Sequence, residues 1–135
     1  ALYLLVQLGR IYSKEVIFKS EDNLTSYHLS SLTRALTYID NNFTQPLRIE
    51  EIAKQAYLSP SYFCYVFKQL THRTIVQYMS EKRVEMMCRL LTSTATPIAT
   101  ISYLSGFSTT THANRVFKER LGISPREYRK SYTSQ

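Results

Sequence analysis

Polar side chains that can hydrogen-bond to a nucleic acid cluster between residues 109 and 118. They are Thr109, Thr110, Thr111, His112, Arg115 and Lys118. Arg115 can donate two parallel hydrogen bonds to the O6 and N7 atoms of guanine, a contact that other base pairs cannot match. Thr111 and His112 can donate to bases or phosphates, while Thr109 and Thr110 suit a phosphate. The plainer interpretations are a solvated surface cation for Arg115 and simple exposure for His112.

Two short helices are expected to position these side chains. Ile98, Ile101 and Leu104 recur at helical spacing, and Gly106 then supplies the flexible residue that ends the first helix. Hydroxyl side chains at 108–111 can cap a second helix, which is expected to stop at a glycine. The apolar residues of this second helix are Ala113, Val116, Phe117 and Leu121. Residues 98–121 therefore predict a helix-turn-helix whose second helix presents the polar residues on its outer face.

An earlier stretch, at about residues 49–70, repeats this pattern. Val-Phe-Lys occurs at both 66–68 and 116–118, and isoleucines stand at matching positions ahead of it. The outward positions of its second helix are Ser61, Tyr62, Cys64 and Tyr65, none of them charged. Ser61 and Tyr65 can hydrogen-bond, and Tyr65 can also press on a thymine methyl group. Tyr62 is equally suited to packing, and Cys64 is better explained as a small residue than as a redox sensor.

The stretch between the two copies, residues 75–91, has regularly spaced apolar residues and no Gly or Pro. It predicts one helix of about 17 residues, roughly 25 Å long. After the second copy, Ser124 can cap a last short helix that begins at Pro125. The expected fold is all-α: two helix-turn-helix subdomains joined by the long central helix, about seven helices, plus an extra N-terminal amphipathic helix.

The second copy and its continuation resemble the signature of the AraC/XylS family of bacterial transcription regulators. The matching anchors at fixed spacing are Gly106-Phe107, Phe117-Lys118, Gly122, Pro125, Tyr128 and Arg129. The resemblance extends over about residues 32–129 and implies an AraC-type DNA-binding domain over 31–131. It also implies activation through contact with RNA polymerase, and an upstream domain that binds a small-molecule effector or dimerises.

Three residues depart from the family pattern. In each copy, the second helix is the one expected to contact DNA bases, and we call it the reading helix. His72 stands where a glycine normally ends the first reading helix, so a left-handed backbone is expected there. Met87 replaces a small residue in the central helix, and Ala113 replaces a usual aromatic residue behind the second reading helix. The core packing is therefore expected to differ from the family pattern, while the expected DNA contacts are kept.

The first 30 residues are expected to lie outside the DNA-binding domain. Residues 2–16 place Leu4, Leu8 and Ile11 on one stripe and predict an amphipathic helix. We interpret it as the end of an upstream regulatory or dimerisation domain, with packing on the main domain as the alternative. Residues 17–30 are polar and aperiodic, and a linker is expected there. The stripe is too short for a stable coiled coil, so this chain should be monomeric even where a longer parent protein dimerises.

Charge and cysteine usage limit the classes of function. The formal net charge is +7, and from Thr71 onward ten Lys and Arg residues stand against four Asp and Glu residues. A basic half suits an anionic partner, and nucleic acid is the commonest one. Cys64 and Cys88 form no C-x-x-C pair, so neither a metal site nor a disulfide framework is expected, and a reducing cytoplasm fits. The three histidines are scattered and no Gly-rich phosphate loop occurs, so neither an enzyme nor a cofactor is expected. The apolar run at the start is too short to cross a membrane.

The expected function is sequence-specific binding of double-stranded DNA in bacterial transcription regulation, with activation favoured. A stiff central helix should hold the two reading helices in successive major-groove segments, about 34 Å apart. The main alternative is a degenerate helix-turn-helix module that binds protein and has little specific DNA binding. A third interpretation is a DNA-binding module attached to a catalytic domain outside this chain. Affinity for DNA that falls steeply with rising salt would favour the first of these.

Overall fold

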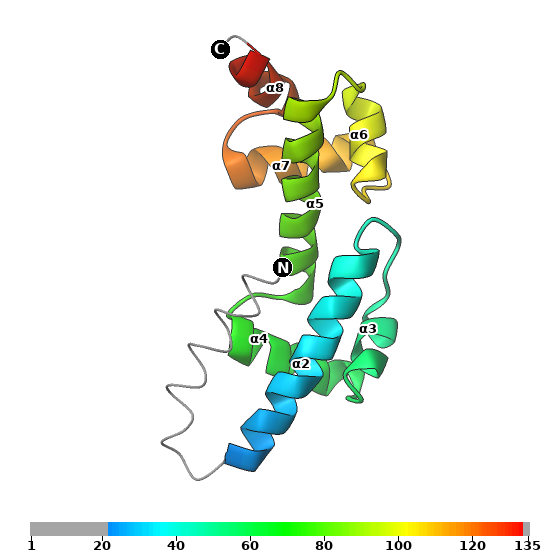
Figure 1. Cartoon of the computed structure of the whole chain (residues 1–135), viewed down its shortest axis with the longest axis vertical. Helices are drawn as coiled ribbons and strands as arrows, with labels where there is room; N and C mark the ends of the chain where they lie inside the picture. Colours follow the sequence, from blue (N-terminus) through cyan, green and yellow to red (C-terminus); the bar gives the residue numbers. More distant parts are fainter. Residues whose placement is uncertain (1–21, 134–135) are drawn as a thin grey trace. The chain divides into compact units, whose positions relative to one another are not determined.

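The structure is a computed structural model that describes residues 22–133 and has seven helices and no strands in that range (Figure 1). The helices are α2 (Asp22–Asn42), α3 (Ile49–Gln55), α4 (Pro60–Thr71), α5 (Ile75–Ser93), α6 (Ile98–Leu104), α7 (Thr110–Leu121) and α8 (Pro125–Thr133). The predicted all-α class is confirmed. Both predicted helix-turn-helix pairs and the long helix between them are present. The helix predicted over residues 2–16 lies outside the described residues.

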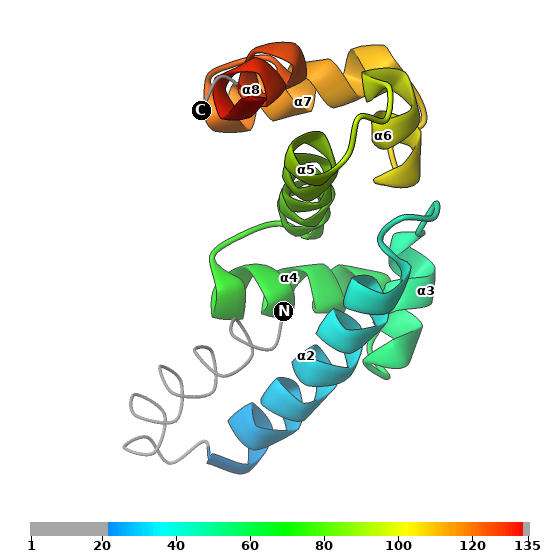
Figure 2. The same ribbon diagram turned by 45° about the horizontal axis from the view of Figure 1, so that its top comes forward.

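The chain divides into two units, each built around one helix-turn-helix. Of the described residues, the first unit contains α2, α3, α4 and the start of α5, up to Gln77. The second contains Phe43–Pro46 together with the rest of α5, from Tyr78, and α6, α7 and α8. Helix α5 runs unbroken from one unit into the other (Figure 2).

Apolar faces of α2, α3 and α4 form the core of the first unit. The buried residues are Leu32, Ala35, Leu36 and Ile39 of α2, Ile52 and Ala53 of α3, and Phe63, Val66 and Phe67 of α4. Helix α4 begins where the sequence predicts, because Ser59 Oγ accepts a hydrogen bond from the Tyr62 amide and Pro60 takes the first helical position. It ends at His72 with φ of 59°, the left-handed conformation expected there. The buried phenylalanines fix the rotation of α4, so its opposite face points to solvent.

Residues 22–30 are helical, although the sequence predicts a linker over 17–30. They carry no apolar stripe, which is why hydrophobic periodicity does not reveal them. Within this stretch, His28 meets Tyr62 of α4 edge to face, with ring centroids 5.6 Å apart. The expected linker therefore overlaps α2, which includes residues 22–30.

The core of the second unit lies between α5, α6 and α7. Its buried residues are Val84, Met87, Leu91, Ile101, Phe107, Ala113, Val116 and Phe117. Met87 and Ala113, two of the departures from the family pattern, have no exposed surface and belong to this one cluster. Protein cores are close-packed, so we infer that the larger residue at 87 fills volume that the smaller residue at 113 leaves open.

Arg83 of the long helix lies between the segment Phe43–Pro46 and the turn of the second helix-turn-helix. Arg83 Nε donates to the Phe43 carbonyl oxygen at 2.9 Å, and its guanidinium carbon lies 6.0 Å from the Phe107 ring centroid. Burial lowers the pKa of Arg83, but an arginine stays charged at neutral pH. Gly106 has φ of 104°, and a Cβ atom there would lie 2.5 Å from the Phe43 oxygen. The glycine at this turn is therefore required by close packing as well as by backbone conformation.

Arg34 of α2 stands at the matching position in the first unit. Its Nε donates to the Gln55 carbonyl oxygen at 3.3 Å, and its guanidinium carbon lies 4.9 Å from the Tyr57 ring centroid. Tyr57 has φ of 57° and occupies the turn position that Gly106 occupies in the second copy. Arg34 precedes α3 by the same number of residues as Arg83 precedes α6. The internal duplication therefore extends into the long helices, beyond the range that the sequence pattern identifies.

Candidate nucleic-acid interface

Helix α7 presents the predicted polar residues of the second unit. Thr109, Thr111, His112, Arg115 and Lys118 are exposed, and Thr110 is half-buried. Thr109 Oγ accepts a hydrogen bond from the His112 amide at 3.1 Å and so caps the helix. The Thr109 oxygen is thus committed to the helix start, and its hydroxyl proton is what it can offer a phosphate. Ala113, Val116 and Phe117 are buried on the other side, so the polar face cannot turn away from solvent.

Arg115 and His112 form a surface pair on α7. Nη2 of Arg115 lies 2.9 Å from Nδ1 of His112, and the His112 ring meets Phe107 edge to face with centroids 5.6 Å apart. Nδ1 can accept this hydrogen bond only when it is unprotonated, since a guanidinium has donors alone. A guanidinium has five N–H donors, so those not engaged with the imidazole remain available for a base.

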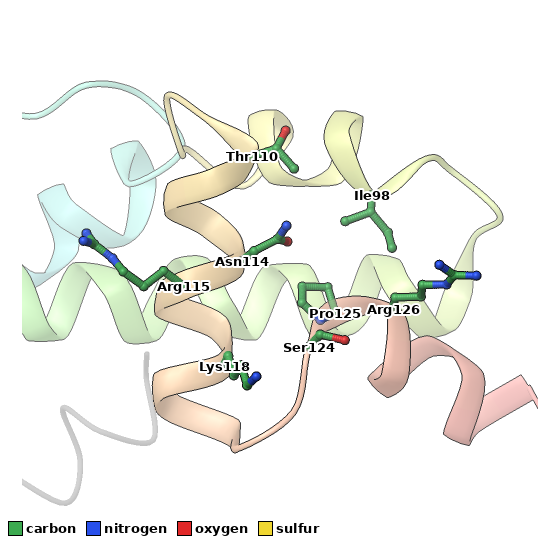
Figure 3. Close-up of a pocket in the computed structure, with 8 residues that line it drawn as sticks. All are labelled: Ile98, Thr110, Asn114, Arg115, Lys118, Ser124, Pro125 and Arg126. Atoms are coloured by element: carbon green, nitrogen blue, oxygen red, sulfur yellow. The ribbon is translucent and has the colours of Figure 1, made fainter.

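A surface groove along α7 contains a residue that the sequence reasoning missed. Its lining residues are Ile98, Thr110, Asn114, Arg115, Lys118, Ser124, Pro125 and Arg126, and its volume is about 470 Å³. Figure 3 shows Thr110 and Asn114 on one side of α7, with Arg115 extending away from them. Asn114 is exposed, and an Asn amide can form two hydrogen bonds to the N6 and N7 atoms of adenine. Helical spacing from Thr110 and Lys118 is the signal that places Asn114 on this face.

The groove is bordered by positive charge and by the start of α8. Arg115, Lys118 and Arg126 line it from α7 and α8. Ser124 Oγ accepts a hydrogen bond from the Glu127 amide at 3.1 Å, which is the cap that the sequence predicts for the last helix. Cations gathered on one face attract a polyanion such as a DNA backbone.

Helix α4 carries the other predicted residues, in the first unit. Ser61 is exposed, Cys64 is half-buried, and Tyr65 has 60% of its surface exposed. Tyr62 is 42% exposed, yet its hydroxyl oxygen lies 3.2 Å from His28 Nε2. The Tyr62 ring is also stacked on Tyr65, with centroids 6.2 Å apart and planes 21° apart. Tyr62 therefore both packs and reaches the surface, so the two interpretations of this residue are compatible.

Other kinds of site find little support in the part of the chain that the structure describes. Over residues 22–133, no group of three or more His, Cys, Asp or Glu side chains is placed to hold a metal ion. None of the helices in that range is both long and apolar enough to span a bilayer. Cys64 and Cys88 are free thiols, and burial raises the pKa of the Cys88 thiol. A raised pKa keeps a thiol protonated and unreactive.

Comparison with known proteins gives a consistent set of similarities. Residues 52–131 match the family model described as a helix-turn-helix domain. The chain is 32% identical over 127 residues to the regulatory protein PocR of Salmonella typhimurium, in an alignment that covers 91% of this chain and 42% of PocR. It is 28% identical over 102 residues to the regulatory protein SoxS of Escherichia coli, covering 76% of this chain and 95% of SoxS. The chain therefore spans less than half the length of PocR.

A similar arrangement of helices is found in a domain solved with DNA. The DNA-binding domain of AdpA, a global transcriptional factor, has been crystallised in complex with a target DNA. It matches the present structure with a TM-score of 0.73 and 25% sequence identity, over 76% of this chain and 93% of the AdpA chain.

Proposed function

The chain belongs to the AraC/XylS family of helix-turn-helix transcription regulators, and on this premise we propose that it recognises a specific sequence of double-stranded DNA through α7 and α4. The observation that carries the proposal is the exposed face of α7. Arg115 and Asn114 are exposed there on a helix whose other face is buried. Each side chain can form two hydrogen bonds to a single base in the major groove. The DNA complex of the similar AdpA domain supports this function.

Within α7, we assign base reading to Arg115 and Asn114, phosphate contacts to the threonines and Lys118, and either role to His112. Arg115 reads guanine, and Asn114 reads adenine, because these are the bases whose major-groove edges match their donors and acceptors. Thr110, Thr111 and Lys118 contact phosphates, which fix the register of the helix on the duplex. His112 donates to a base or a phosphate through the ring nitrogen that does not face Arg115.

Within α4, the side chains favour weaker discrimination. Ser61 and Tyr65 each offer one hydroxyl, which both donates and accepts and so tolerates several bases. Tyr65 can add preference for thymine through its methyl group. Cys64 is half-buried and offers only a weak hydrogen-bond donor. We therefore propose that α4 contributes affinity mainly through phosphate contacts and DNA shape, and that α7 supplies most of the sequence discrimination.

We further propose that α4 and α7 enter successive major-groove segments of one duplex, about one helical turn or 34 Å apart. The presence of one helix-turn-helix in each of the two units supports this proposal. Family resemblance supports the regulatory context: activation through contact with RNA polymerase, in the bacterial cytoplasm. It also supports an upstream domain in the parent protein that binds a small-molecule effector or dimerises, while the present chain acts as a monomer.

The test is a titration of the full chain against a duplex that it selects from random sequence. Each base pair is then substituted in turn, and the dissociation constant is measured at fixed salt. Losses of affinity should cluster in the segment protected by residues 108–118 and be smaller under residues 60–68. Clustering under α4 instead would make the assignment of reading residues wrong. Equal affinity for the selected and random duplexes would exclude specific recognition altogether.

A protein-interaction module is the second candidate, because the four predicted outward positions of α4 are uncharged and two of them are exposed tyrosines. Salt dependence separates the two functions. Each phosphate neutralised on B-DNA contributes a slope of about −0.9 to the logarithm of affinity against the logarithm of salt. A slope near zero, with weak binding to every duplex, would favour the interaction module.

A further inference from the structure

A line of four aromatic rings leads from the start of α2 to the exposed face of α4. Tyr27 meets His28 edge to face with ring centroids 6.0 Å apart, and His28 meets Tyr62 in the same way at 5.6 Å. Tyr62 then stacks on Tyr65 at 6.2 Å. The family model matches residues 52–131, so the α2 end of this line lies outside the part of the chain that the model covers.

A hydrogen bond fixes the middle of the line. The Tyr62 hydroxyl oxygen and His28 Nε2 are 3.2 Å apart. One tautomer of His28 accepts the Tyr62 proton at Nε2, and the other donates its own proton to the Tyr62 oxygen. In both cases the Tyr62 hydroxyl is no longer free to rotate. When it donates to His28 it can only accept a hydrogen bond from a DNA base, and when it accepts from His28 its own proton remains available to a base.

We propose that His28 is a positioning residue for base reading by α4: it orients Tyr62, and through the stacked ring it sets the placement of Tyr65. The proposal rests on the proposed function, since it concerns how the first reading helix prefers one base over another. A tyrosine side chain at 42% exposure can adopt other rotamers when nothing holds its end. The bond from α2 removes that freedom before DNA arrives, so the ordering need not occur on binding.

The second reading helix provides an internal parallel. Both helices begin at a hydroxyl cap, Ser59 and Thr109, so Tyr62 and His112 occupy the same helical position. His112 contacts the reading residue Arg115 three positions later, as Tyr62 contacts Tyr65. In each helix, a ring at the third position therefore supports the side chain that reads bases. Only in α4 do we assign the orientation of that ring to a residue of another helix.

The test compares four forms of the full chain: His28→Ala, His28→Gln, Tyr62→Phe and the double variant His28→Ala with Tyr62→Phe. The probe is the selected duplex and its single base-pair substitutions, measured at fixed salt. His28→Ala and Tyr62→Phe should each reduce base preference under α4 roughly two- to tenfold, as expected for one lost hydrogen bond. The double variant should be no worse than either single variant, because both remove the same contact. His28→Gln keeps a donor and an acceptor and should restore part of the preference.

Controls separate positioning from general damage. Ser26→Ala changes an exposed residue of the same helix and should leave the profile unchanged. Base preference under α7 should stay within about twofold in every variant, since separate sites act independently. Thermal unfolding of each variant shows whether stability has changed, and a lower stability with an unaltered base profile would mean that the contact is only structural.

Three results would overturn the inference: an unchanged base profile in His28→Ala, additive losses in the double variant, or equal weakening on the selected and random duplexes. The last would make His28 a phosphate contact. Failure of the proposed function is recognised separately, because the unmodified chain would then show no base preference under either helix, and the inference would fall with it.

Discussion

Replacing Arg115 by alanine is the most direct test of how α7 recognises DNA. The side chain is exposed on the surface of α7, where Nη2 forms a hydrogen bond with the neighbouring His112 ring at 2.9 Å. Truncation therefore removes donors from the interface without opening a cavity in the core. Surface substitutions of this kind change the free energy of unfolding by about 0.5 kcal/mol or less. Any large effect on DNA binding would consequently arise at the interface.

The magnitude follows from the contact that Arg115 is proposed to make. A bidentate hydrogen bond to guanine is worth about 1–3 kcal/mol of discrimination against other bases. Since about 1.4 kcal/mol corresponds to a tenfold change in affinity, Arg115→Ala should raise the dissociation constant for the selected duplex roughly 5- to 150-fold. Preference at one base-pair position should be lost, while preference at the other positions should remain. The His112 ring that remains cannot replace the two parallel donors that Arg115 offers to guanine.

Fluorescence anisotropy titrations with the selected duplex, its single substitutions and a random duplex measure these effects. Arg120→Ala is the matched control, because it removes the same charge from another exposed position of the same helix. The control should weaken all duplexes by a similar factor. If Arg115→Ala also weakens the selected and random duplexes equally, Arg115 contacts a phosphate and the reasoning about base reading is refuted.

Three further outcomes are expected. Gly106→Ala should lower the free energy of unfolding, measured by urea denaturation, by about 1–3 kcal/mol more than Gly122→Ala does. The reason is that a Cβ atom at 106 would lie 2.5 Å from the Phe43 oxygen, whereas one at 122 has no atom within 4 Å. Equal losses in the two variants would show that only the positive φ matters. Hydrogen bonding with Tyr132 and burial raise the pKa of Tyr128 above its ordinary value of 10.0. As pH rises, the unfolded chain therefore loses this proton before the folded chain does, so the free energy of unfolding falls above about pH 10. Tyr128→Phe removes the titrating group, so the loss of stability between about pH 8 and pH 11, measured by thermal melts, should be smaller in this variant. Sedimentation at micromolar concentration should give a monomer, because the predicted N-terminal stripe is too short for a stable coiled coil; a tight dimer would contradict this.

The helices that could be predicted are those whose signals are local. Helix α4 has Ser59 as its cap and Pro60 at its first position, and α7 has Thr109 as its cap and Gly122 at its end. Such signals lie within a few residues of the helix that they define. The start of α2 has no comparable signal. Its packing depends on a contact between His28 and a residue 34 positions away, which periodicity cannot detect.

The exposure of the proposed contact residues follows from local signals of the same kind, whereas their contacts with DNA stay a prediction. The composition of residues 109–118 indicates hydrogen bonding to DNA, and the structure places the predicted residues of α7 at its surface. Asn114 was missed although helical spacing puts it on the same face as Thr110 and Lys118. Pairing between Arg115 and His112 was also missed, because sequence spacing gives proximity on a helix but not which atoms meet.

The duplicated scaffold fits the proposal that α4 and α7 differ in the bases that they read. Positions that set the fold are matched in the two copies: a hydroxyl cap begins each reading helix, a left-handed residue ends it, and an arginine lies over an aromatic ring of the preceding turn. Positions that face outward are matched only in part: the exposed Lys68 and Lys118 correspond, whereas Tyr65 stands where the second copy has Arg115. Exposed substitutions cost little stability, so recognition could diverge between the copies without loss of the fold. A tyrosine hydroxyl tolerates several bases, whereas an arginine fork favours guanine. Unequal reading by α4 and α7 is therefore the expected result of matched helix ends that carry different side chains at positions 65 and 115.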